Sequence, residues 1–252
     1  MSTCNNMNAH WLSADKDPMG QAIYDYYQTG RAEKLRVFSS QFDEDELPVS
    51  GLFRTFEQMP PLEQTALRMA QGKILDVGAG SGCHSWALKG LGKESVAIDI
   101  SPLSVEVMQK RGLNAHLVNV FDERFAGQFD TILMLMNGSG IIGKLKNMPA
   151  FFTRVRQLLA PGGCILMDSS DLRYLYEEED GSYMIDLAAN YYGEVDFQMQ
   201  YGKTKGESFD WLYIDFDTLS AYASQYGFRT EKVQEGRHYD YLARLTYMSK
   251  DA

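Results

Sequence analysis

The sequence has few cysteines, and their spacing argues against a zinc site or a disulfide framework. Its 252 residues contain three of them, Cys4, Cys83 and Cys164, without a Cys-x-x-Cys pair. The four histidines are also isolated from one another, which predicts no cluster of metal ligands. A small, odd number of cysteines is typical of a reducing compartment. We therefore expect a cytoplasmic protein without a bound metal.

Long apolar segments are missing as well. The uninterrupted run at 132–136 is far shorter than the roughly 20 residues that a transmembrane helix requires. The first residues show no basic stretch followed by an apolar one, so we expect no secretory leader. These absences predict a protein that is not embedded in a membrane.

Positive charge is in deficit. Lys and Arg number 24 against 34 Asp and Glu, which gives a formal net charge of -10. A chain this acidic is a poor partner for phosphate backbones and for anionic membranes. Nucleic acid is therefore not expected as a substrate. The hydrophobic content of 44% and the charged content of 23% are those of an ordinary folded globular protein.

Short apolar runs alternate with helical patterns from about residue 73 onward. The runs predict strands, and the segments between them predict helices of about 10 residues. Such βαβ units produce a parallel sheet, and continuous apolar strands indicate that helices cover both of its faces. The expected strands lie at 73–77, 95–99, 115–118, 129–136 and 164–168, and the expected helices at 83–91, 101–112 and 150–159.

The regions on either side of these units follow other patterns. Residues 1–72 predict a helical cap segment, with helices at 19–27 and 61–69. The core is expected to extend over 73–252.

Within that core, alternating aromatic and polar residues predict an inserted β-hairpin at about 194–214, on both sides of a glycine-bounded turn. A helix at 218–226 and a final strand at 238–248 then fit an antiparallel end to the sheet.

The chemistry begins at the turn Asp76-Val-Gly-Ala-Gly-Ser-Gly82, which follows the first core strand. Glycines at such a turn let the backbone approach a ligand closely, and ligands of open α/β sheets bind beyond the carboxyl ends of the strands. Asp99 ends the second strand, where a carboxylate can accept hydrogen bonds from both ribose hydroxyls. The turn and the acid together predict a ligand that contains adenosine.

The glycine spacing separates two classes of cofactor. The dinucleotide fingerprint G-x-G-x-x-G would need its third glycine at Cys83. Here the third glycine is Gly82 instead, and an acid, Asp76, precedes the first one. A pyrophosphate favours a bare helix N-terminus, whereas a ligand with a free ammonium group favours a nearby carboxylate. The spacing therefore favours an amino-acid-bearing nucleoside over NAD.

The stretch from Asp76 to Gly82 resembles motif I of the class I S-adenosylmethionine-dependent methyltransferases, with the acid and all three glycines matched. The resemblance covers about 73–168, and the final strands more loosely. It implies a Rossmann-like, doubly wound α/β sheet of seven strands, mostly parallel with an antiparallel last strand. Further similar stretches are 96–101, with the ribose-binding acid, 119–121, at the adenine contact, 129–136, at the fourth strand, and 158–163, before the fifth.

The resemblance implies S-adenosylmethionine as cofactor and assigns residues to each of its parts. The methionine moiety would be held by Asp76 and by the backbone of the turn, the ribose by Asp99, and the adenine by three further side chains. The backbone after the fourth strand would close the pocket beside the sulfur. Asn119 departs from the family, which often has Asp there, but an amide oxygen can still accept a hydrogen bond from adenine. The implied cofactor-binding residues are Asp76, Gly78, Ala79, Gly80, Gly82, Asp99, Ile100, Asn119, Val120, Leu135 and Asn137.

The acceptor side of the site is less defined. In-line transfer from a sulfonium depends largely on positioning, and a base is needed only if the acceptor is protonated. No catalytic residue is therefore assigned. The polar loop 137–140 is either part of the acceptor site or a simple turn. Asp168 and Asp171 follow the fifth strand, where metal-dependent relatives place acids, but Asn137 provides no second carboxylate and no catalytic metal is expected.

Three aromatic or charged features near the site have both a functional and a structural interpretation. Tyr24 or Tyr27 lines the acceptor pocket, or both pack against the sheet edge. Arg173 binds an anionic acceptor, or it forms an ion pair with Glu177 four residues later. His84 is expected to pack beside the glycine turn rather than to act in catalysis.

Three functions remain open from the sequence. The leading hypothesis is a methyltransferase that acts on a small molecule. The alternatives are a protein that binds an adenosyl ligand without catalysis and an NAD-dependent oxidoreductase. The acceptor and the oligomeric state are not predicted.

Overall fold

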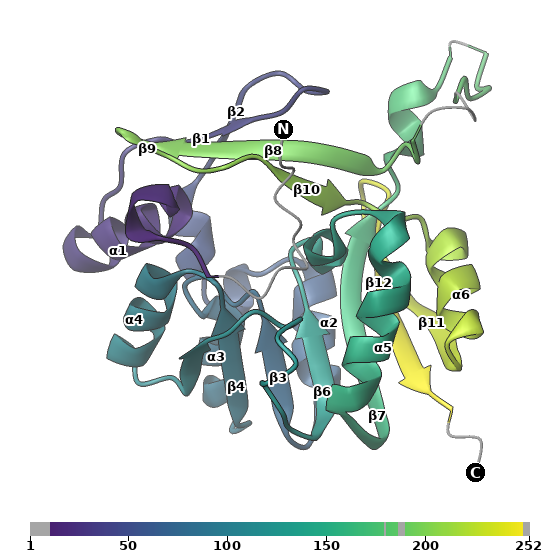
Figure 1. Ribbon diagram of the computed structural model, residues 1–252, viewed down its shortest axis with the longest axis horizontal. Coiled ribbons are helices and arrows are strands. Elements are labelled where there is room, and N and C mark those ends of the chain that lie inside the picture. Colours follow the sequence, from purple (N-terminus) through teal and green to yellow (C-terminus); the bar gives the residue numbers. More distant parts are fainter. Residues whose placement is uncertain (1–10, 179, 186–189, 249–252) are drawn as a thin grey trace.

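The computed structural model describes residues 11–178, 180–185 and 190–248. Its main element is a sheet of seven strands in the order β11-β12-β7-β6-β3-β4-β5 (Figure 1). The strands are β3 Ile74–Val77, β4 Ser95–Asp99, β5 Ala115–Leu117, β6 Phe129–Met134, β7 Leu159–Ser170, β11 Phe228–Glu235 and β12 Asp240–Tyr247.

The pairing of these strands confirms the predicted fold class. β3 pairs in parallel with β4 and β6, and the parallel pairs β4–β5 and β6–β7 extend the sheet on both sides. The last strand, β12, is antiparallel to both β7 and β11. Because the chain moves outward from β3 in one direction and later in the other, β3 marks the topological switch point, where such sheets bind their ligands.

Helices cover both faces of this sheet, as the continuous apolar strands predict. One face packs against α2 Pro61–Met69, α3 Cys83–Gly90 and α4 Pro102–Lys110. The other face packs against α5 Met148–Leu158 and α6 Phe216–Gln225, and this side holds the largest apolar core.

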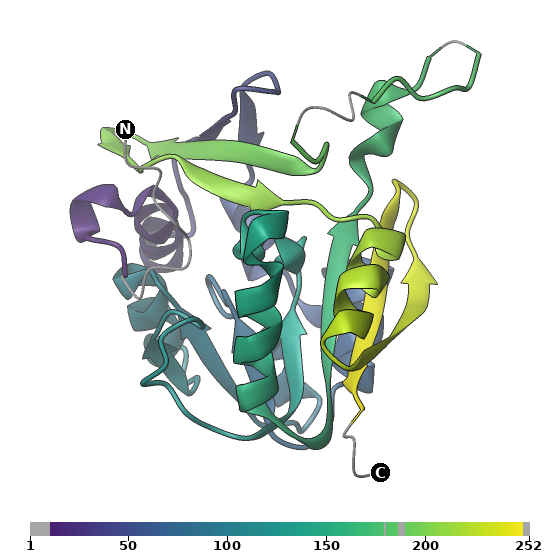
Figure 2. The same ribbon diagram turned by 45° about the vertical axis from the view of Figure 1, so that its right-hand side comes forward.

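A second, smaller sheet lies over the carboxyl ends of the main strands (Figures 1 and 2). It confirms the predicted hairpin, whose strands β8 Glu194–Tyr201 and β10 Phe209–Leu212 pair antiparallel, with β9 Thr204–Lys205 beside β8. The N-terminal segment adds β1 Leu35–Phe38 and β2 Asp45–Leu47, and β1 pairs with β8. We call this sheet the roof.

The cap segment expected at 1–72 contains two short strands as well as helices. The two expected helices are present, as α1 Pro18–Thr29 and as α2. Between them, however, β1 and β2 are only a few residues long, too short for an alternating pattern to stand out. Their main partner, β8, lies far away in the sequence, so local patterns carry no signal of it.

The sequence also misses β11. This strand forms the edge of the main sheet and pairs only with β12 among the described strands, with an irregularity between Lys232 and Gln234. Its residues are mostly polar because much of it faces solvent. The remaining short 3₁₀ helices are η1 Ala14–Lys16, η2 Val49–Phe53, η3 Phe56–Gln58, η4 Gly138–Ile142, η5 Leu145–Asn147 and η6 Leu172–Tyr176.

No helix in the described part of the chain combines the length and the apolar character needed to span a bilayer.

Candidate active site

The glycine turn leaves β3 at the switch point with a left-handed backbone. Gly78, Gly80 and Gly82 have φ values of 69°, 56° and 79°, a region that other residues rarely adopt. A Cβ on Gly78 would lie 2.9 Å from the Ile141 side chain. The amides of Gly78 and Ala79 both donate to the carbonyl of Ile98, which fixes the turn against β4.

The structure brings Asp99 directly to this turn. Its Oδ2 accepts a hydrogen bond from the Gly80 amide at 2.8 Å, and its Oδ1 accepts one from the Ser101 amide at 2.8 Å. Burial raises the pKa of Asp99 to about 6, although both of these hydrogen bonds favour the charged form. Each oxygen retains a further lone pair, so the carboxylate can still accept hydrogen bonds from a ligand.

Asp76 lies at the end of β3, 2% exposed, and accepts a hydrogen bond from the Ser85 hydroxyl at 2.7 Å. Beside it, His84 contacts Glu63 of α2 at 2.8 Å. Although burial opposes its positive charge, the hydrogen bond to Glu63 raises the pKa of His84. Arg54 forms an ion pair with the same Glu63. In its predicted packing role, His84 is thus part of a buried network with Glu63 and Arg54.

The residues predicted at the adenine lie at the ends of β4 and β5. Ile100 is 37% exposed, and its carbonyl accepts a hydrogen bond from the Leu12 amide at 2.9 Å. Asn119 and Val120 are buried in the turn after β5. The Oδ1 of Asn119 accepts a hydrogen bond from the Phe121 amide at 2.9 Å, which engages one lone pair of the oxygen expected to face adenine.

The loop after β6 lies between the glycine turn and the roof. Leu135 is buried among the residues that face α2 and α3, whereas Met136 and Asn137 are partly exposed and have φ values of 66° and 54°. Gly140 packs so closely on Trp211 of β10 that any Cβ there would overlap the indole ring.

The N-terminal segment covers the same region from the other side. Asp17, the N-cap of α1, is fully buried and accepts hydrogen bonds from the Gly20 amide at 2.8 Å and the Ser101 hydroxyl at 2.5 Å. Ser101 in turn caps α4. Ile23 of α1 faces Gly80. This contact, which the sequence did not reveal, fastens α1 above the turn.

The two tyrosines proposed for an acceptor pocket have different positions. Tyr24 packs under Lys110 of α4, whose ammonium lies 4.7 Å from the ring centroid. Tyr27 is 37% exposed. Tyr24 thus packs against α4, whereas the alternative interpretation placed it against the sheet edge.

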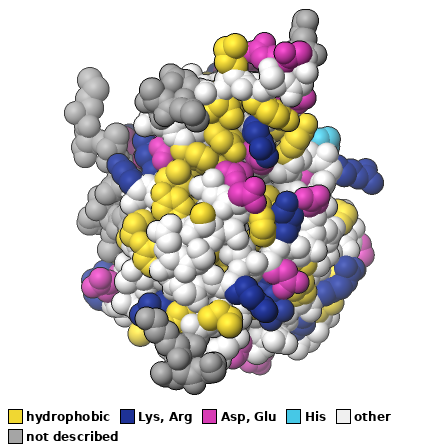
Figure 3. Space-filling model, turned by 90° about the vertical axis from the view of Figure 1, so that its right-hand side faces the viewer, with side chains coloured by type: hydrophobic (Ala, Val, Ile, Leu, Met, Phe, Trp, Pro, Cys, Tyr) yellow, Lys and Arg dark blue, Asp and Glu magenta, His cyan; other side chains and the backbone are white. Residues whose placement is uncertain are grey.

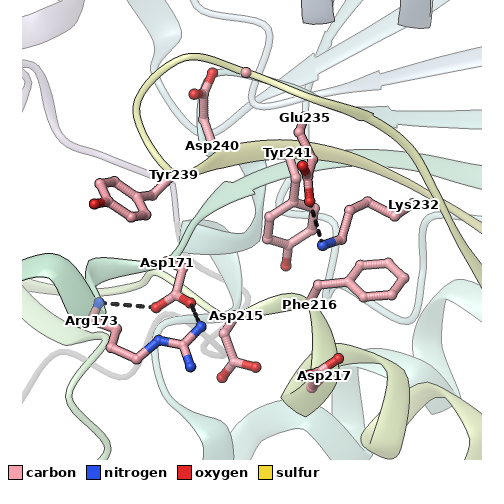
Figure 4. Close-up of a pocket in the computed structure, with 11 residues that line it drawn as sticks. Asp171, Arg173, Asp215, Phe216, Asp217, Lys232, Glu235, Tyr239, Asp240 and Tyr241 are labelled. Atoms are coloured by element: carbon pink, nitrogen blue, oxygen red, sulfur yellow. Dashed lines mark hydrogen bonds and ion pairs between the residues drawn. The ribbon is translucent and has the colours of Figure 1, made fainter. Parts of the chain in front are cut away.

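A separate hollow of about 300 Å³ lies at the edge of the main sheet, between α6 and the β11–β12 turn (Figure 4). Acidic, basic and apolar side chains alternate on this face (Figure 3). Here Arg173 pairs with Asp171 at 2.7 Å, so the predicted pair with Glu177 is wrong. Asp171 also caps η6, where its carboxylate accepts a hydrogen bond from the Arg173 amide. None of the lining residues belongs to the glycine turn.

Among the described residues, no group of His, Cys, Asp and Glu side chains has the arrangement of a metal site. The carboxylate of Asp168, expected after the fifth strand, instead accepts hydrogen bonds from the amides of Met136 and Gly138.

Comparison with known proteins gives the family. Residues 75–165 match the model of a methyltransferase domain. The cypemycin N-terminal methyltransferase of a Streptomyces species is 29% identical over 102 residues, which span 39% of this chain and 42% of that protein, less than half of its length.

Solved structures extend the comparison to the whole chain. An S-adenosylmethionine-dependent methyltransferase from Bacteroides fragilis, crystallised with S-adenosyl-L-homocysteine, is 66% identical, with a TM-score of 0.91, and the match covers 96% of this chain and 100% of that one. The CcbJ methyltransferase from Streptomyces caelestis shares the fold at 14% identity, with a TM-score of 0.63 over 94% of this chain and 100% of its own. With the glycine turn and Asp99 at the switch point, the chain belongs to the class I S-adenosylmethionine-dependent methyltransferase family.

Proposed function

We propose that the cofactor lies along the carboxyl ends of β4, β3 and β6, and that the methyl group is transferred to a small-molecule acceptor under the roof. The observation that carries this proposal is the hydrogen bond between the Gly80 amide and Asp99. This hydrogen bond joins the backbone of the glycine turn to the carboxylate suited to a ribose.

The residues around the turn fit the parts of S-adenosylmethionine. Asp99 would hold the ribose hydroxyls with its remaining lone pairs, and the exposed side chain of Ile100 would cover one face of the adenine, with Asn119 and Val120 at its edge. The methionine moiety would lie on Gly78–Gly82, with its ammonium group near Asp76. These roles follow from the position of each residue at the switch point.

Arg54 is a candidate partner for the carboxylate of the methionine moiety. Its Nε is buried and has no hydrogen-bond partner in the described part of the chain. Its charge lies near Asp168 and Cys83, which flank the loop after β6 and the start of α3. An anionic group would satisfy this donor, whereas an apolar ligand would leave it buried and unpaired.

The cofactor supplies a methyl group that is already activated as part of a sulfonium. The chain's own residues therefore bind and orient the cofactor and the acceptor, and they exclude water from the site. The turn and Asp99 fix the nucleoside, α1 and η2 cover it, and the loop 135–140 with Trp211 borders the space for the acceptor. No general base is assigned, because an acceptor that is unprotonated at the working pH needs none.

The acidic charge supports a small acceptor over nucleic acid. The relative that methylates the N-terminus of cypemycin adds peptides with a free amino terminus as a second class of acceptor to test.

Two buried thiols that form no disulfide, Cys83 and Cys164, fit the reducing cytoplasm as the location. We retain the division into a cap at 1–72 and a core at 73–252, with strands added to the cap.

The test is methyl transfer from radiolabelled S-adenosylmethionine to fractionated metabolites and to short peptides. We expect label in a small-molecule fraction, and none when Asp99→Asn replaces the wild type. Glu106→Gln, a change at a partly exposed position on α4, is the matched control and should retain activity. Cofactor binding by calorimetry without transfer to any fraction would favour the non-catalytic alternative.

A further inference from the structure

Side chains at the carboxyl end of β7 hold the loop after β6 through hydrogen bonds. The Oδ2 of Asp168 accepts a hydrogen bond from the Met136 amide at 3.2 Å, and its Oδ1 accepts one from the Gly138 amide at 3.0 Å. The Ser170 hydroxyl donates to Asn137 Oδ1 at 2.8 Å. We call Asp168 and Ser170, with these hydrogen bonds, the β7 clamp.

The loop after β6 has a backbone conformation that needs these hydrogen bonds. Met136 and Asn137 are consecutive non-glycine residues in the left-handed region, where side chains crowd the backbone. Strained residues of this kind persist only where their surroundings hold them, and they concentrate at functional sites. Asp168 supplies those surroundings, because it binds the amides on both sides of Asn137.

The loop also connects the two sides of the proposed site. Ile141 touches the position above Gly78 in the glycine turn, and Gly140 lies against Trp211 in the roof. The Ser139 hydroxyl donates to the carbonyl of Leu212 at 2.8 Å. A shift at Met136 and Asn137 would therefore change the position of the loop relative to both the cofactor and the acceptor.

We propose that Asp168 is a positioning residue for methyl transfer: its carboxylate holds Met136 and Asn137 in the geometry that receives the sulfonium end of the cofactor. The inference rests on the proposed location of the cofactor. It also explains why an acid lies near the end of β7 without a metal cluster among the described residues, since both carboxylate oxygens accept backbone hydrogen bonds.

The surroundings of Asp168 predict how this role depends on pH. Burial raises the pKa of Asp168 to about 6, against the opposing effect of the backbone hydrogen bonds. The charged groups that act on it are Glu63 and His84, and its own charge acts on Arg54 and Tyr241. Protonation would remove one acceptor, so the clamp should weaken as the pH falls through about 6.

Asp99 titrates in the same range, so the test needs a ligand that reports on Asp99 alone. Adenosine reaches the ribose and adenine subsites but not the loop after β6, whereas S-adenosylmethionine reaches both. Calorimetry with the two ligands on wild type and Asp168→Asn at pH 7.5 separates the two effects. Asp215→Asn is the control, because Asp215 is a partly buried acid that accepts a backbone hydrogen bond from Thr218 and lines the separate hollow instead of the glycine turn.

We expect Asp168→Asn to weaken S-adenosylmethionine binding about tenfold, as for the loss of a charged hydrogen bond, with adenosine binding unchanged. The ratio of the two affinities should fall below pH 6 in wild type and stay constant in the variant. Equal losses for both ligands, or no loss for either, would overturn the proposal.

Two further measurements keep the result decisive. If Asp168→Asn does not fold, Ser170→Ala removes the Asn137 contact alone and should weaken S-adenosylmethionine in the same direction but less. An unchanged affinity in that variant, together with a constant affinity ratio in wild type across pH 5 to 8, would reject the clamp. Failure of wild type to bind either ligand would instead reject the proposed location of the cofactor.

Discussion

Besides Asp76, three buried carboxylates surround the proposed cofactor site, and each is held by backbone or hydroxyl donors. Asp17 lies above the glycine turn, Asp99 beside it and Asp168 behind the loop after β6. Burial raises the pKa of all three. Raised values in a cluster at the switch point are typical of a functional site.

These carboxylates predict how stability depends on pH. Because their pKa values are higher in the folded than in the unfolded chain, the folded state takes up protons first as the pH falls. The free energy of unfolding should therefore be larger at pH 5.5 than at pH 7.5, by about 1 kcal/mol for each group with a pKa of about 6. Urea unfolding at the two pH values measures this.

The same dependence should shrink in the Asp168→Asn variant, which lacks one of these groups. A wild-type protein that loses stability steadily between pH 7.5 and pH 5.5 would contradict the assignment of raised pKa values.

At the scale of residues, the sequence predicted which side chains belong to the site better than it predicted their hydrogen-bond partners. Asp76, Asp99 and the glycines could be assigned because their function depends on spacing along one turn and one neighbouring strand. The places of Asp17 and Asp168 at the site could not, because they depend on hydrogen bonds from Ser101 and Gly138, which lie 84 and 30 residues away in the chain. No local pattern records such contacts.

At the scale of elements, one buried network joins η2, α2 and α3. Arg54 contacts Glu63, and Glu63 contacts His84, with all three side chains largely buried. Breaking a buried ion pair leaves an uncompensated charge. We expect Glu63→Gln to lower the free energy of unfolding by about 3 kcal/mol, while the exposed Glu57→Gln, on η3, should have little effect. Denaturant unfolding of both variants is the measurement, and equal effects would show that the network contributes no stability.

A second contact between elements attaches the roof. Because a Cβ on Gly140 would overlap Trp211, Gly140→Ala should destabilise the protein by about 1–3 kcal/mol through overpacking. Adding Trp211→Ala should relieve the overlap, so the double variant should lose less than the sum of the single variants. Gly51→Ala is the control, since its Cβ would meet nothing within 4 Å. Strict additivity in thermal unfolding would mean that the roof does not pack on this loop.

At the scale of the whole molecule, the main sheet could be predicted and the roof only in part. The five parallel strands and their helices follow from continuous apolar runs that alternate with helical patterns. The hairpin β8–β10 follows from its own alternation and its turn. The pairing of β1 with β8 joins segments more than 150 residues apart, and the edge strand β11 is mostly polar, so neither has a local signal.

The arrangement of the two sheets predicts that the cofactor occupies the carboxyl ends of β4, β3 and β6, beneath α1 and the roof. A crystal structure of this protein with S-adenosylmethionine tests it most directly. We expect both ribose hydroxyls within hydrogen-bond distance of Asp99 and the methionine moiety on the glycine turn, with the sulfonium beside Met136 and Asn137. A nucleoside bound elsewhere, or a ribose that leaves Asp99 without contact, would contradict it.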